Sequence, residues 1–150
     1  MKFGSRIARA LAAALCLSAG TVGADDSSFA SLGNIASADG GTIYTHVCQG
    51  CHMPQGEGAV GAGHYPAFAK NPRLASWQYV AMLVLSGRNG MPPFGLPADQ
   101  VSEIRTVHLS DAQVADVVNY VRSHFGNAYA DRATADQVAA LPHPDQALPR

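Results

Sequence analysis

The sequence has no apolar stretch long enough to span a membrane, no concentration of basic residues and few cysteines. Its longest apolar run, at 10–19, is far shorter than the roughly 20 residues that a membrane-spanning helix needs. Lys and Arg number 10 against 11 Asp and Glu. No segment gathers the basic residues into the patch that marks a nucleic-acid-binding protein. We therefore expect no nucleic-acid partner, and no membrane span once any export signal is removed.

The first 24 residues have the pattern of a cleaved signal peptide. Three basic residues precede the apolar run, and Val-Gly-Ala at 22–24 supplies small side chains for cleavage. A retained membrane anchor is the alternative, which the short apolar run disfavours. Cleavage after about Ala24 predicts a periplasmic protein with 7 Lys and Arg against 11 Asp and Glu, a formal net charge of −4. Residues 25–36 are small and polar, and we expect a flexible lead-in there.

Periodicity and capping signals predict an all-α domain with three main helices. The first is expected over 38–48, with Ser37 as its N-cap. The second is expected over 77–86, is apolar nearly all round and ends at Gly87. Between them, residues 53–75 are rich in Gly and Pro, which indicates a loop without strands.

The third helix is predicted over 111–125, and its start carries the clearest signal. Ser110 and Gln113 have the spacing of a capping box. Apolar residues recur at helical spacing and predict a buried face: Val114, Val117, Val118, Val121 and Phe125. The residues expected to point away from that face are Asp116, Asn119 and Arg122. A weaker helix is expected over 136–141, after a cap at Thr134.

Residues 48–52, Cys-Gln-Gly-Cys-His, form the C-x-x-C-H pattern of c-type haem attachment. The thiols of Cys48 and Cys51 would each add across one haem vinyl group, which holds His52 under the iron as its proximal ligand. Two other interpretations are weaker. A zinc site commonly uses a second Cys/His pair, and no second pair of cysteines exists. A thioredoxin-like redox pair requires a βαβ setting, whereas this chain is expected to be helical.

A second axial ligand is expected on the other face of the iron, and Met91 is the best candidate. It lies between a glycine and a proline, in a loop whose stiffness would keep its backbone close to the haem. Met53 follows the proximal histidine directly and cannot reach round the macrocycle. Met82 lies in an apolar helix, where methionine usually fills core space. His64 is the main rival, and an exposed loop methionine at 91 is the remaining alternative.

Over about residues 37–126 the sequence resembles the class I cytochromes c. Gly-Thr-Ile-Tyr at 41–44 and Tyr-Val at 120–121 are similar to the segments where the first and last helices of that family cross. The resemblance implies the class I cytochrome c fold, with three main helices packed around one covalently attached haem c. Residues 97–108 and 127–150 depart from compact relatives, and we expect a surface insertion and a surface C-terminal extension there.

The resemblance also implies roles for three residues around the haem. Tyr-Pro-Ala-Phe at 65–68 resembles the loop whose proline carbonyl accepts a hydrogen bond from the proximal histidine, so Pro66 would orient His52. A plain turn proline is the alternative. Arg73 and Trp77 lie where the family often contacts the haem propionates, although a solvent-exposed arginine is an equal alternative.

A His/Met pair would fill both axial positions and raise the reduction potential. The chain is therefore expected to carry single electrons by outer-sphere transfer and not to be an enzyme on its own. The haem edge is expected among residues 59–62 and 91–94, where few charges lie. Because the chain is small, we expect Met82, Val117 and Val121 to face the haem and the haem-free chain to fold poorly.

The pattern as a whole is similar to cytochrome subunits of exported dehydrogenases of the flavin, quinoprotein or molybdenum type. This implies a dehydrogenase as the electron donor and the respiratory chain as the acceptor. Two alternatives stay open. One is a freely diffusing cytochrome that serves a terminal oxidase or reductase, and the other is a haem sensor or haem enzyme in which the distal methionine leaves the iron.

Overall fold

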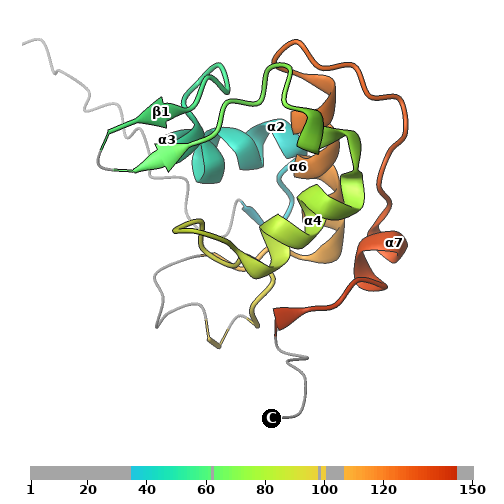
Figure 1. Ribbon diagram of the computed structural model, residues 1–150. Coiled ribbons are helices and arrows are strands. Elements are labelled where there is room, and N and C mark those ends of the chain that lie inside the picture. The colour runs from blue at the N-terminus through green and yellow to red at the C-terminus, as the bar shows by residue number, and fades with distance from the viewer. Residues whose placement is uncertain (1–34, 62, 98, 101–106, 145–150) are drawn as a thin grey trace, which may run out of the picture.

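The computed structural model describes residues 35–61, 63–97, 99–100 and 107–144. The predicted signal peptide, nearly all of the lead-in and much of the insertion lie outside this range. Within it, no helix is both long enough and apolar enough to cross a bilayer. The described chain is mainly helical and carries one small hairpin (Figure 1).

The first helical segment is continuous but changes its hydrogen-bond period along its length. It consists of α2 (Gly40–Ile43), the π-helical turn η1 (Tyr44–Cys48) and α3 (Gln49–His52). The predicted N-cap at Ser37 is wrong, because Asp39 caps the helix. The Asp39 carboxylate accepts a hydrogen bond from the Thr42 amide at 2.7 Å. The backbone of Asp39 has the extended conformation that is typical of an N-cap residue.

The second helix lies where the sequence predicts it. α4 spans Trp77–Ser86, and Ser76 caps its start. Gly87 ends it with a φ of +67°, which glycine adopts without strain. Just before α4, within the segment predicted as a loop, a 3₁₀ turn η2 covers Pro72–Ala75 and is capped by Asn71.

The third helix, α6 (Asp111–Ser123), begins with the predicted capping box between Ser110 and Gln113. Its valine face is buried as predicted: Val114, Val117, Val118 and Val121. Two residues expected to face solvent are buried instead, with 5% of Asn119 and 1% of Arg122 exposed. The C-terminal extension returns over this side of α6 and covers both, which helical spacing alone does not reveal.

Most residues in the described part of the C-terminal extension are at least partly exposed, in line with the expected surface extension, but the segment is anchored to α6. It carries α7 (Ala135–Ala139), which begins at the predicted cap Thr134 and lies beside α6 (Figure 1). Val138 of α7 is fully buried. The Asn119 side chain donates a hydrogen bond to the Ala133 carbonyl at 2.9 Å and accepts one from the Ala133 amide at 2.8 Å. These contacts bury the Asn119 side chain between α6 and the extension.

A short hairpin is the element that the sequence did not predict. β1 (Ala59–Val60) and β2 (His64–Tyr65) pair antiparallel, with Ala59 opposite Tyr65. Each strand has only two residues, so alternation of apolar and polar side chains is too short to give a strand signal. The hairpin lies beside α3 (Figure 1).

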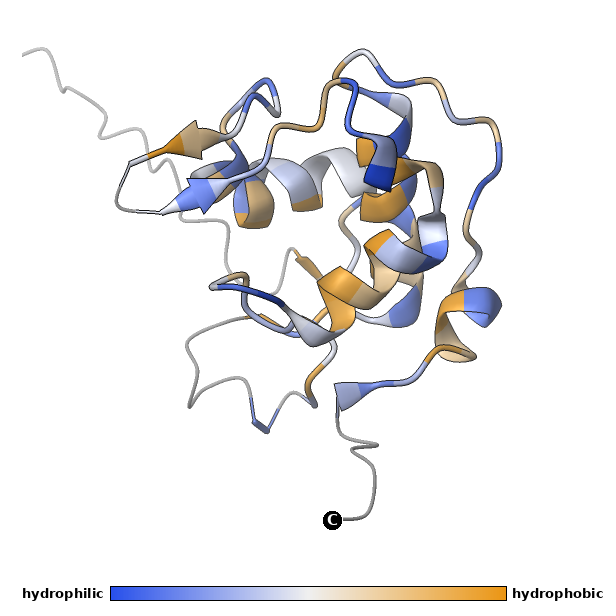
Figure 2. Ribbon diagram, in the orientation of Figure 1, coloured by the Kyte–Doolittle hydropathy of each residue, from blue (hydrophilic) through white to orange (hydrophobic). Residues whose placement is uncertain are grey.

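α2 and α6 cross in close contact, as the resemblance implied. A Cβ atom on Gly40 would lie 2.2 Å from the Asp116 carbonyl oxygen, so only glycine permits this approach. Next to the crossing, the rings of Tyr44 and Tyr120 lie 5.6 Å apart. The core lies between these helices and α4, on which strongly hydrophobic residues are concentrated (Figure 2).

Candidate functional site

The end of the first helical segment carries two thiols and an imidazole. Cys48 and Cys51 are unpaired, and Cys51 is exposed. Burial, with the neighbouring Cys51 as a second cause, raises the pKa of the Cys48 thiol to about 12. Cys48 is therefore a neutral thiol at physiological pH and not an activated redox nucleophile, which disfavours the thioredoxin-like interpretation.

The imidazole of His52 is oriented by the loop that follows the hairpin. Its Nδ1 lies 3.4 Å from the Pro66 carbonyl oxygen, the pairing that the resemblance implied. The Phe68 ring stacks on the imidazole at 4.5 Å between centroids. Burial lowers the pKa of His52, and the Pro66 carbonyl acts in the opposite sense. A neutral imidazole with Nδ1 turned to a carbonyl leaves Nε2 available as a metal ligand.

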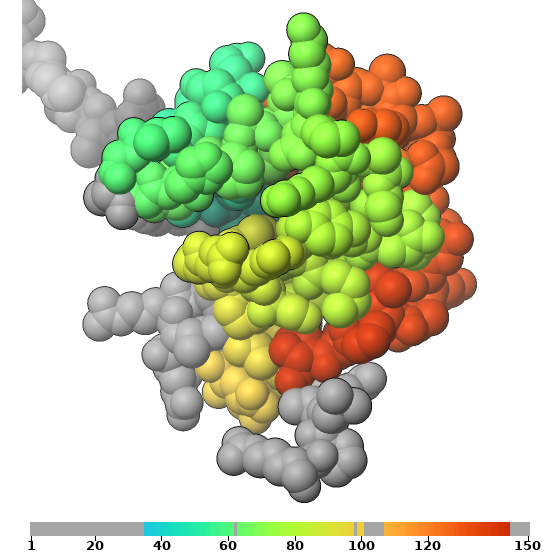
Figure 3. All heavy atoms as spheres, in the orientation of Figure 1, coloured from blue at the N-terminus to red at the C-terminus, as the bar shows by residue number. Residues whose placement is uncertain are grey.

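An apolar cleft adjoins these groups. The empty space around its inner residues is about 720 Å³, with the adjoining open solvent included. The cleft opens between the hairpin region and the residues that follow α4 (Figure 3). Besides Pro66 and Met91, the apolar side chains that line the inner part are Phe68, Leu74, Val80, Leu83, Val84, Val117, Val118 and Val121.

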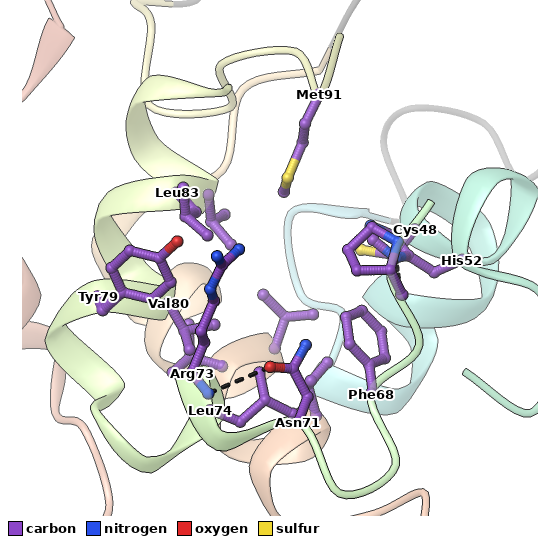
Figure 4. Close-up of a pocket in the computed structure, with 15 residues that line it drawn as sticks. Cys48, His52, Phe68, Asn71, Arg73, Leu74, Tyr79, Val80, Leu83 and Met91 are labelled. Atoms are coloured by element: carbon purple, nitrogen blue, oxygen red, sulfur yellow. Dashed lines mark hydrogen bonds between the residues drawn. The ribbon is translucent and has the colours of Figure 1, made fainter. Parts of the chain in front are cut away.

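Met91 lies across the cleft from His52, and its sulfur points into the cavity (Figure 4). The loop that carries it is closed by two backbone hydrogen bonds between Arg88 and Met91, of 2.9 and 3.0 Å. Gly87 lies against this loop, since a Cβ there would come within 2.4 Å of the Met91 carbonyl oxygen. The turn thus fixes the Met91 backbone next to the cleft.

The other candidates for a distal ligand are placed less favourably. Neither Met53 nor Met82 lines either part of the cleft that the structure describes, and His64 is exposed at its mouth. The expectation that Met82 faces the cofactor is therefore wrong, whereas Val117 and Val121 do line the cleft. A helix rotates by about 100° per residue, so on α4 it is the residue after Met82, not Met82 itself, that points inward.

One side of the cleft carries polar groups. Arg73 and Arg88 both line it, and the Arg88 guanidinium lies 3.4 Å from the Tyr79 hydroxyl. Trp77 does not line either described part and packs against the core. Sequence reasoning missed Arg88 and Tyr79, because α4 is apolar nearly all round and its sequence does not reveal which face lines the cleft. The only available signal for Arg88 is its position in the same loop as Met91.

The expected edge of the site is only partly as predicted. Met91, Pro92 and Phe94 line the mouth of the cleft. The hairpin contributes His64 and Tyr65 there, whereas β1 turns its Val60 outward with 85% of its surface exposed. The mouth therefore lies between β2 and the Met91 loop.

These residues fit a haem. Two thiols stand one helical turn apart for covalent attachment, an imidazole and a thioether face the same cavity from different sides, and the wall between them is apolar. A zinc site fits less well, because no three His, Cys, Asp or Glu side chains cluster in the part of the chain that the structure describes. The donor set favours haem over the two alternatives.

Comparison with known families matches residues 37–125 to the cytochrome c family. The alcohol dehydrogenase (quinone) cytochrome c subunit of Gluconacetobacter polyoxogenes is 32% identical over 111 residues, which is 73% of this chain and 23% of that protein. The fructose dehydrogenase cytochrome subunit of Gluconobacter japonicus is 34% identical over 110 residues, 67% of this chain and 21% of that protein.

A third relative extends the pattern to another dehydrogenase. The gluconate 2-dehydrogenase cytochrome c subunit of Pantoea cypripedii is 32% identical over 117 residues, 70% of this chain and 24% of that protein. The chain thus spans about a quarter of the length of the curated relatives that it matches.

Proposed function

Because the chain belongs to the cytochrome c family, we propose that it is an exported carrier of single electrons that holds one covalently attached haem c. Its all-α fold is the class I cytochrome c fold, as predicted. The observation that carries the proposal is the arrangement around the cleft, with two thiols and an imidazole on one wall and a thioether on the facing wall.

Each of these residues has a distinct role in the proposal. The thiols of Cys48 and Cys51 would hold the haem covalently, because each S–H can add across one vinyl group without an oxidant. His52 is the proximal ligand, oriented by the Pro66 carbonyl, and Met91 is the distal ligand. The haem supplies reversible one-electron chemistry of iron. With His52 and Met91 both holding the iron, no coordination position would be left for a small substrate, and the chain would exchange electrons with other proteins.

The polar side of the cleft binds the propionates in this proposal. Arg73 and Arg88 supply two guanidinium groups there, and Tyr79 is held beside Arg88. Guanidinium groups pair well with carboxylates. Trp77, which begins α4 and packs against the core, lines neither described part of the cleft and is not proposed as a direct contact.

We further propose that an exported dehydrogenase is the electron donor and that the respiratory chain is the acceptor. Support comes from relatives named as cytochrome subunits of alcohol, fructose and gluconate dehydrogenases, although this chain spans only about a quarter of their length. Apart from Arg73 and Arg88, which are assigned to the propionates, the described side chains that line the mouth of the cleft include no Lys, Asp or Glu, which favours docking by apolar contact over long-range steering. The donor is of the flavin, quinoprotein or molybdenum type.

The decisive experiment is mass spectrometry of the protein matured in a host that attaches haem c. We expect a single haem adduct on the wild-type chain and a mature N-terminus at about residue 25. The double variant Cys48→Ala with Cys51→Ala should carry no adduct and should not stain for haem on a denaturing gel. A wild-type protein without an adduct would reject the proposal.

Two further measurements separate the proposal from its alternatives. The ferric protein should show the weak long-wavelength band of a methionine–iron bond, and Met91→Ala should lose it, whereas a sensor with a labile ligand lacks the band already in the wild type. Stopped-flow mixing with a dehydrogenase encoded beside this chain should reduce the haem rapidly. No reduction by it, together with rapid oxidation by a terminal oxidase, would indicate the freely diffusing carrier.

A further inference from the structure

Arg122 on α6 is buried on the side of the fold away from the cleft mouth. Only 1% of it is exposed, and its guanidinium makes four hydrogen bonds. Nε donates to the Leu74 carbonyl at 2.8 Å, and Nη2 donates to the Ala75 carbonyl at 3.1 Å. Both carbonyls belong to η2, so one charged side chain on α6 holds the backbone of that turn.

The other two bonds of Arg122 go to the C-terminal extension. Nη2 donates to the Asp131 carboxylate at 2.7 Å, and Nη1 donates to the Asp131 carbonyl. The Tyr129 ring also lies 5.1 Å from the guanidinium carbon. A buried guanidinium requires such partners, because an unpaired buried charge is strongly destabilising. Asp131 therefore supplies the charge that keeps Arg122 in place.

The turn that Arg122 holds forms part of the cleft wall. Leu74 turns its side chain into the inner cleft and its carbonyl toward Arg122. Arg73, one residue earlier, lines both parts of the cleft. The Arg73 amide donates a hydrogen bond to the side chain of Asn71, the cap of η2, at 3.1 Å. The hydrogen bonds from Arg122 to the Leu74 and Ala75 carbonyls therefore determine the positions of Arg73 and Leu74 relative to the cleft.

We propose that Arg122 and Asp131 are positioning residues of the cofactor site, which hold η2, and with it Arg73 and Leu74, against the cleft. The inference rests on the proposed haem function. In this proposal the C-terminal extension, which compact relatives of the family lack, helps to position residues of the site through Asp131. Lysine cannot replace Arg122 in this role, because a single ammonium group cannot bridge two carbonyls and a carboxylate in one fixed fork.

A double-mutant cycle on the haem-loaded protein tests the proposal. Arg73→Gln removes a positive charge beside the haem, which should lower the ratio of reduced to oxidised protein, measured at one fixed poise potential, by about twofold or more. In an Arg122→Lys background, Arg73 is no longer held in place, so the same change should have less than half of that effect on the ratio.

Val138→Ala is the control background. It removes buried packing between α7 and α6 and lowers stability, but it leaves the bonds between Arg122 and η2 untouched. Arg73→Gln should retain its full effect there. If Arg122→Lys gives no folded protein, the same cycle is run in Asp131→Asn, with Asp136→Asn, an exposed acidic residue of the extension, as its matched control.

An equal effect of Arg73→Gln in the wild-type and Arg122→Lys backgrounds, including no effect in either, would overturn the proposal. The proposal would also be overturned if Val138→Ala weakened the effect of Arg73→Gln on the ratio as much as Arg122→Lys does. The coupling would then reflect a general loosening of the fold. The wild type is stained for haem first. Absence of haem rejects the proposed function and this inference with it, whereas loaded protein with equal effects rejects the inference alone.

Discussion

The two walls of the cleft are built in different ways. The thiol and imidazole wall comes from one unbroken stretch, residues 48–52. The Met91 wall depends on contacts with distant segments, because the Phe94 amide bonds the Val84 carbonyl at 2.9 Å and the Leu109 amide bonds the Phe94 carbonyl at 2.8 Å. Covalent spacing defines the first wall and tertiary packing defines the second. Changes around the two walls should therefore have separable effects.

The largest effect is expected where α2, the start of the helical segment that carries the thiols, crosses α6. Gly40→Ala would place a Cβ 2.2 Å from the Asp116 carbonyl oxygen, forcing α2 away from α6. We expect a loss of about 3 kcal/mol in the free energy of unfolding, the upper end for overpacking, measured by denaturant titration of the loaded protein. Gly50→Ala is the control, since a Cβ there meets nothing within 4 Å. Equal losses in the two variants would contradict the crossing as described.

The Met91 wall should fail without loss of attachment. Gly87→Ala forces a positive φ on alanine and places a Cβ 2.4 Å from the Met91 carbonyl oxygen. We expect about 2 kcal/mol of destabilisation and loss of the methionine–iron band, while haem staining stays complete.

Gly90→Ala gives the matched comparison for that variant. It has a positive φ as well, but a Cβ there meets nothing within 4 Å. Its band should survive. If Gly87→Ala keeps the band, or loses haem staining along with it, the two walls are not separable in this way.

A smaller effect is expected at the Tyr44 hydroxyl, next to the end of the helical segment that carries the thiols. Tyr44 donates a hydrogen bond to the Met53 carbonyl at 2.6 Å, just after His52. Tyr44→Phe should lower the free energy of unfolding by about 1 kcal/mol, the usual net value of one hydrogen bond.

The pH dependence of the wild type checks the same contact. Burial is the main cause that raises the pKa of Tyr44 from 10.0 to about 12. The folded state then holds this proton more tightly than the unfolded state, so stability falls as the pH rises from about 10 to 12. Tyr44→Phe should lack this part of the decline, and an unchanged slope would show that the hydroxyl does not titrate in this way.

The smallest effect is expected at the start of the first helical segment. Asp39→Ala removes the cap and should lower the melting temperature, whereas Ser37→Ala should leave it unchanged. The Thr42 amide lowers the pKa of Asp39, so this stabilisation is present above the ordinary carboxyl pKa and fades as the pH falls through the lowered one. Melting curves recorded across acid pH measure this stabilisation. A larger fall in melting temperature in Ser37→Ala than in Asp39→Ala would favour Ser37 as the cap instead.

Local signals in the sequence were good guides to the helices and poor guides to their surroundings. Both bounds of α4 and the capping box of α6 are as predicted, because they depend on residues at most a few positions apart. Asn119 and Arg122 were placed on the wrong side because the segment that covers them lies beyond the helix. The hairpin was missed because two-residue strands leave no period to detect.

The candidate site divides along the same line. Cys48, Cys51, His52 and Met91 were all singled out from the sequence, since their chemistry depends on residue type and short-range spacing. Arg88 and Tyr79 were not, because α4 is apolar on nearly every side and only packing decides which side lines the cleft.

Residue spacing alone thus specifies a haem attachment motif, because the two thiols and the imidazole lie within five consecutive residues. Folding brings Met91 to the cavity that the motif faces and decides which arginines border it. It also decides that a segment after α6 returns to pair with Arg122. Those choices require contacts between residues far apart in the chain, and burying a charge or a thioether depends on everything that packs around it.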